Sequence, residues 1–90
     1  MSKYAMVSAD FPDVTSTQRD KIYICLGEKK WHKFKNLGRD ISTTWWAHFD
    51  DDFTESEIIS TSVSEFKECS KPYTVPLLVV HVGPNKPKEY

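Results

Sequence analysis

A basic and aromatic stretch near the middle of the chain has the composition of a nucleic-acid contact. Between positions 29 and 39, lysine and arginine are interleaved with Trp31 and Phe34. Cations pair with phosphates, and aromatic rings stack on unpaired bases. The lysines also have a structural explanation, because charges on an edge strand prevent unwanted strand pairing. The candidate nucleic-acid contacts in this stretch are Lys30, Lys33, Lys35 and Arg39.

An aspartate and two histidines are candidates for metal coordination. Asp10 stands at the end of the first strand-like segment, and His48 and His81 each lie in a later one. If the three side chains share one face of a sheet, they supply a carboxylate and two imidazoles to a transition metal. The alternatives are an aspartate that caps a turn and histidines that lie half-buried at an interface, where their titration affects assembly.

Length, charge and hydropathy limit the classes of protein to which the chain can belong. Its 90 residues suffice for one domain, which we take as residues 1–90 with an extended tail over 83–90. A hydrophobic fraction of 39% predicts a folded chain, and a net charge of −1 argues against a protein that coats nucleic acid. The chain has no apolar run of membrane-spanning length and no apolar leader, so we expect a cytoplasmic protein without a membrane partner.

The two cysteines are expected to be free. Cys25 and Cys69 are far apart in the sequence and have no CxxC spacing. In the reducing cytoplasm such residues are normally buried thiols. A metal-binding or redox role is the alternative.

Four segments have the character of strands. Apolar residues of both parities fill the first and last of them, as in strands that are covered on both faces. The third segment alternates β-branched and aromatic residues with polar ones, so that Trp45 and Trp46 point to opposite faces of a sheet. The second segment alternates poorly. These strand-like segments are residues 3–11, 31–37, 41–49 and 75–82.

Two helices are predicted between these strands. Thr15 with Gln18, and Thr54 with Glu57, have the spacing of a capping box, which marks the first turn of a helix. Pro72 ends the second helix. The apolar stripes that should face the core are Ile22, Tyr23, Cys25 and Leu26 in the first helix, and Ile58, Ile59, Val63 and Phe66 in the second.

The order β-α-β-β-α-β predicts an α+β domain with the ferredoxin-like fold. Right-handed crossovers put both helices on one face of a four-stranded antiparallel sheet, with the first and third strands in the middle. The opposite face is left uncovered, and an apolar face of this kind predicts a homodimer. The residues that we expect at the interface are Met6, Trp46, His48, Leu78 and Val80.

Ferredoxin-like sheets serve many functions, so motifs must discriminate between them. The third strand-like segment lacks the Arg/Lys-Gly-aromatic start of an RNA-recognition domain. The chain also lacks the CxxC loop of a copper chaperone and the Gly-rich phosphate loop of an acylphosphatase.

In element order, and in Asp10, Arg19, Trp31 and the apolar final strand, the chain resembles the small dimeric adaptation protein of CRISPR systems and its relatives, the VapD toxins. That family is nuclease-like and metal-dependent, and its late C-terminal strand completes the sheet of the partner. The resemblance implies that Asp10 is a catalytic residue, that the Asp10 carboxylates of two protomers hold one Mg²⁺ at the dimer axis, and that Arg19 contacts nucleic acid.

Two departures from the family pattern bear on catalysis. Ala9 stands where the family has a tyrosine, and residues 32–36 replace its Gln-x-Ser-Val-Phe stretch. We therefore expect a non-catalytic interaction module on a nuclease-like scaffold, which binds a protein or a nucleic acid. The alternative is a Mg²⁺-dependent ribonuclease or deoxyribonuclease.

Overall fold

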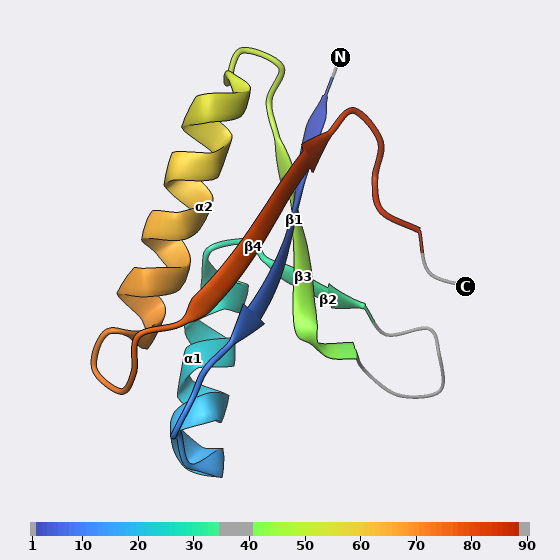
Figure 1. The fold of residues 1–90 in the computed structure, drawn as a ribbon. Helices are drawn as coiled ribbons and strands as arrows, with labels where there is room; N and C mark the ends of the chain where they lie inside the picture. The colour runs from blue at the N-terminus through green and yellow to red at the C-terminus, as the bar shows by residue number, and fades with distance from the viewer. Residues whose placement is uncertain (1, 35–40, 89–90) are drawn as a thin grey trace.

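The structure is a computed structural model and describes residues 2–34 and 41–88 (Figure 1). Its elements alternate in the order that the sequence predicts. They are β1 (Lys3–Asp10), α1 (Ser16–Glu28), β2 (His32–Phe34), β3 (Ile41–Phe49), α2 (Glu55–Ser70) and β4 (Leu77–Gly83).

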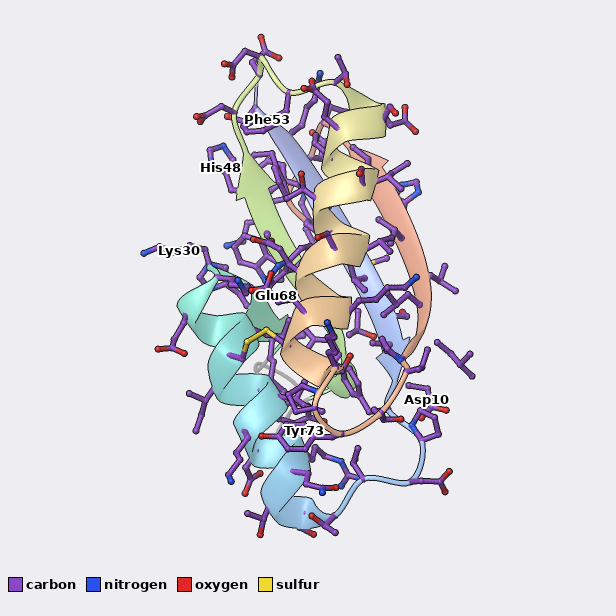
Figure 2. The ribbon with its side chains drawn as sticks, turned by 90° about the vertical axis from the view of Figure 1, so that its left-hand side faces the viewer. Asp10, Lys30, His48, Phe53, Glu68 and Tyr73 are labelled. Carbon is purple, nitrogen blue, oxygen red and sulfur yellow. A yellow bond between two sulfur atoms is a disulfide. The ribbon has the colours of Figure 1, made fainter. Side chains whose placement is uncertain are left out.

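The four strands form one antiparallel sheet in the order β2-β3-β1-β4. The first and third strands are therefore central, which confirms the ferredoxin-like α+β fold. Both helices lie on the same side of the sheet (Figure 1), and in the view from that side they stand in front of it (Figure 2). One face of the sheet is thus covered by helices and the other is not.

Both predicted capping boxes are present. The Thr15 hydroxyl accepts from the Gln18 backbone N–H at 3.2 Å, and the Thr54 hydroxyl accepts from that of Glu57 at 3.1 Å. In return, the Glu57 carboxylate accepts from the Thr54 N–H at 2.9 Å, and this bond lowers the pKa of Glu57. Each box satisfies backbone donors that the first turn of a helix leaves without an intrahelical partner.

The core lies between the helices and the sheet and is built around Trp45. This side chain is 1% exposed, and its ring makes edge-to-face contacts with Phe11, Tyr23 and Phe66. The rings therefore join α1, α2 and the residue that follows β1 to the central strand β3. The buried cluster comprises Ala5, Val7, Ala9, Phe11, Ile22, Leu26, Trp31, Trp45, Ala47, Ile58, Phe66 and Cys69.

The buried stripe of α2 differs from the predicted one at two positions, since Ile59 is exposed and Val63 is only half-buried. Ile58 and Phe66 are buried as expected, but Ile59 is 37% exposed, because the buried face follows i, i+4 spacing and includes Ser62. The Ser62 hydroxyl donates to the Ile58 carbonyl at 2.7 Å, and Ser70 donates to Phe66 at 2.8 Å. Because these hydroxyl groups are satisfied by the backbone, the polar residues can be buried.

The two cysteines form a disulfide, so the prediction of free thiols is wrong. Cys25 near the end of α1 and Cys69 near the end of α2 are linked, with an S–S distance of 2.01 Å (Figure 2). Both residues lie on the buried side of their helices, where the helix ends meet. The sequence gives no sign of this proximity, because 44 residues separate the two positions.

Within the described residues, neither helix combines the length and the apolar character that crossing a membrane requires.

Candidate binding surface on the uncovered sheet face

The sheet face opposite the helices, here called the open face, carries several of the residues that the sequence singles out for function. Ala5, Val7 and Ala9 of β1 are buried against the helices, so the residues between them point to the open face. Cross-strand pairing extends this set to the other strands. The open face carries Tyr4, Met6, Ser8, Asp10, His32, Thr44, Trp46, His48, Leu77, Val79 and His81.

Four rings form a continuous line across three strands of the open face, here called the aromatic row: His32, Trp46, Tyr4 and His48. The ring centroids are 4.6 Å apart for His32 and Trp46, 6.3 Å for Trp46 and Tyr4, and 5.2 Å for Tyr4 and His48. Both histidines are exposed, while Tyr4 and Trp46 are half-buried. The row therefore presents accessible ring surface to a ligand.

The segment after β4 contributes a cation to the aromatic row. The Lys86 ammonium nitrogen lies 4.6 Å from the centroid of the Trp46 ring, which is within the range of a cation–π interaction. This segment runs on the side of the sheet away from the helices (Figure 1).

The other half of the open face is aliphatic. Leu77 and Val79 of β4 are 65% and 70% exposed, opposite Asp10 and Ser8 of β1. Together with their neighbours these residues line a shallow hollow formed by residues 8–10 and 77–79. Asp10 is exposed at its end, as the sequence predicts for an aspartate on the uncovered face.

The predicted metal site of Asp10, His48 and His81 is wrong for a single chain. His48 pairs with Tyr4 and His81 with Met6, whereas Asp10 lies at the far end of β1 (Figure 2). Six and four residues of extended strand correspond to about 20 and 13 Å. In residues 2–34 and 41–88, no three His, Cys, Asp or Glu side chains are close enough together to hold a metal ion.

The predicted basic contacts that the structure describes are spread over the molecule: Lys30 lines a hollow with His48 at the edge of the sheet, and Arg19 and Lys33 belong to α1 and β2. The Lys33 ammonium nitrogen is 4.2 Å from the centroid of the Tyr23 ring of α1, on the helix side of the sheet. Burial raises the pKa of Tyr23, and the nearby Arg19 charge opposes that rise. Arg19 lies in the first turn of α1, whereas Lys30 comes after its C-terminal end. The structure therefore does not bring these cations together with Asp10, and Lys35 and Arg39 lie outside the described residues.

The five predicted interface residues divide between the two faces. Met6, Trp46 and His48 lie on the open face, whereas Leu78 and Val80 pack against the core. Sequence reasoning missed Leu77 and Val79. In a continuous apolar run, polar and apolar residues do not alternate, so the sequence does not show which side chains are exposed. It also missed His32 and Tyr4. Tyr4 could have been found, because it lies two residues before Met6 in the same strand and so points to the same face.

The two edges of the sheet differ in their protection against pairing. β2 has three residues, carries Lys33 and shifts register between Lys33 and Phe34. β4 has seven residues, Leu77–Gly83, without lysine, proline or an irregular pairing, and Pro76 and Pro84 stand just outside it. In the described part of the chain, β4 pairs only with β1, so one of its edges has no strand beside it.

Comparison with protein-family models, with curated proteins and with solved structures finds no match to this chain.

Proposed function

We propose that this protein is a homodimeric, non-catalytic binding module in which β4 pairs with β4 of a second copy and the open face binds another macromolecule. The observation that carries the proposal is the unprotected edge of β4. An edge strand presents a row of backbone N–H and C=O groups to any strand that approaches. Natural edges are usually short, charged, bulged or interrupted by proline, and β2 has three of these features while β4 has none.

Symmetry fixes the arrangement that such pairing produces. Two identical edge strands that pair antiparallel are related by a two-fold axis normal to the sheet. The dimer then has one continuous sheet of eight strands, with both helix layers on one side and both open faces on the other. In the register that puts Val79 at the axis, Val79 of one copy faces Val79 of the other and Leu77 lies beside this pair. That register buries aliphatic surface that is 65% and 70% exposed in the single chain.

The solution mass tests this arrangement. We expect wild-type protein to scatter light as a particle of twice 10.4 kDa. A variant with Leu77→Lys and Val79→Lys should scatter as a monomer. Four lysines would lie close together at the two-fold axis, and like charges facing each other destabilise the pairing of two strands. Both positions point away from the core, so the variant should keep its fold.

Val75→Lys is the matched control. Val75 is 75% exposed and precedes Pro76, outside the strand, so the same change of residue type should leave the dimer intact. A monomeric wild type, or a double-lysine variant that remains a dimer, would contradict pairing through β4.

The disulfide bears on the location of the protein. Stable disulfides are typical of oxidising compartments and of the cytosol of hyperthermophiles, and they are rare in other cytosols. The expectation of a cytoplasmic protein rests on apolar runs alone. A stable disulfide agrees with that expectation only if the cytosol is that of a hyperthermophile. Alkylation of protein taken from its native cells, followed by mass measurement, would show whether Cys25 and Cys69 are linked there.

A Mg²⁺-dependent nuclease is the second candidate function. Its support is the position of Asp10, which is exposed on the open face at the end of β1 beside an apolar hollow. The two candidates need different dimers. Pairing through β4 separates the two β1 strands by three strand spacings, or about 14 Å, so two Asp10 carboxylates could not share one ion.

Cleavage assays on RNA and DNA separate these candidates. For the binding module, we expect wild type and Asp10→Ala to show the same background cleavage in Mg²⁺ and in chelator, and the same mass. Cleavage by the wild type that disappears both with chelator and with Asp10→Ala would favour the nuclease and contradict the proposed function.

A further inference from the structure

We propose that the aromatic row binds single-stranded nucleic acid by stacking on its bases. This inference rests on the proposed function, since it names the class of macromolecule that the open face binds. The row crosses β2, β3 and β1, and its ring centroids are 4.6, 6.3 and 5.2 Å apart in succession.

The chemistry of the row suits nucleobases better than an apolar peptide. Every ring in it has a flat π-face, on which any base can stack, and a polar edge that can form hydrogen bonds. The aliphatic side chains Leu77 and Val79 lie apart on β4, in the strip assigned above to pairing between protomers. A protein partner that sought apolar contact would meet that strip, whereas the row offers mainly stacking.

Charge near the row complements a phosphate backbone. The Lys86 ammonium group lies over the Trp46 ring at 4.6 Å, and Lys88 follows in the same exposed segment. A base that stacks on Trp46 replaces this ammonium group, which then becomes available to a phosphate one nucleotide away. The cation–π contact thus occupies the ring until a base arrives.

The ligand is single-stranded because a duplex hides the faces of its bases. Binding to duplexes relies on many phosphate contacts, and a chain with a net charge of −1 does not supply a basic surface of that kind. The RNA-recognition motif that the sequence lacks is one way of placing rings on the central strands. In this protein Tyr4 and Trp46 place rings on the two central strands, β1 and β3, without that motif.

Fluorescence anisotropy with labelled oligouridylate, oligothymidylate and a short DNA duplex tests the proposal. We expect both single strands to bind more tightly than the duplex, and Trp46→Leu to weaken binding by about 5- to 100-fold. Trp46→Phe keeps a ring and should retain most of the affinity. Tyr4→Leu, farther along the row, should also weaken binding and serves if Trp46→Leu does not fold.

Salt dependence separates stacking from charge. Each phosphate contact on a single strand contributes a slope of about −0.7 to the logarithm of affinity against the logarithm of salt concentration. Lys86→Ala should therefore make the slope shallower by about 0.7, whereas Trp46→Leu should leave the slope unchanged while lowering affinity. Ile24→Ala removes a 65%-exposed apolar side chain from α1, on the other side of the sheet, and should change neither quantity.

Two results would overturn the proposal: a wild type that binds no single strand, or folded Trp46→Leu and Tyr4→Leu variants that bind as well as the wild type. Light scattering on the same samples keeps this failure distinct from failure of the proposed dimer. A dimer that binds no oligonucleotide contradicts the ligand class alone, and a monomer that binds contradicts pairing through β4 alone.

Discussion

Replacement of Trp45 by alanine is expected to lower the free energy of unfolding by about 3–5 kcal/mol. The side chain is 1% exposed and touches the rings of Phe11, just after β1, Tyr23 of α1 and Phe66 of α2, so its loss leaves a cavity between the sheet and both helices. The stability of a small domain is about 5–15 kcal/mol, so this one replacement should remove a large share of the total. Urea denaturation, followed by circular dichroism, measures the change.

Trp46→Ala is the matched control for this experiment. The two tryptophans are neighbours in β3 but face opposite sides of the sheet, and Trp46 is only half-buried. We expect its replacement to lower the free energy of unfolding by less than half as much as Trp45→Ala. Equal losses at the two positions would contradict the assignment of a covered and an uncovered face.

Loss of the disulfide is expected to lower the free energy of unfolding by about 4 kcal/mol. The bond joins residues 44 positions apart, and closing a loop of that length restricts the unfolded chain by this amount in the chain-entropy description. Urea denaturation of wild-type protein with and without reductant measures the effect. All samples need one protein concentration, because the stability of a dimer depends on it.

The variant with Cys25→Ala and Cys69→Ala controls for other effects of the reductant. Its denaturation midpoint should match that of reduced wild type and should not respond to reductant. A wild type whose midpoint is the same in both conditions would show that the two sulfur atoms are not bonded in the folded protein.

Much of the fold follows from local signals in the sequence. The boxes at Thr15 and Thr54 mark both helix starts, because a capping side chain acts on the backbone only three residues away. The alternation in β3 assigns Trp45 to the core and Trp46 to the uncovered face. The element order then gives the sheet topology through the handedness of the crossovers.

The candidate site follows less well, because it depends on contacts between distant segments. The run at Leu77–Val80 is apolar at every position, so the exposed parity becomes visible only once β4 lies at an edge. The link between Cys25 and Cys69 depends on how α1 and α2 pack. Likewise, the contact of Lys86 with Trp46 joins segments 40 residues apart that no local pattern connects.

Hydrogen exchange at the backbone amides of β4 tests pairing between protomers most directly. In a single chain, every second backbone N–H of Leu77–Gly83 points toward β1 and is protected. The N–H groups between them point outward from the free edge of β4 and should exchange rapidly. We predict that both sets are protected in wild-type protein, and that the outward set loses its protection in the variant with Leu77→Lys and Val79→Lys. Rapid exchange of the outward set in the wild type would show that the edge of β4 is open and would contradict the proposed dimer.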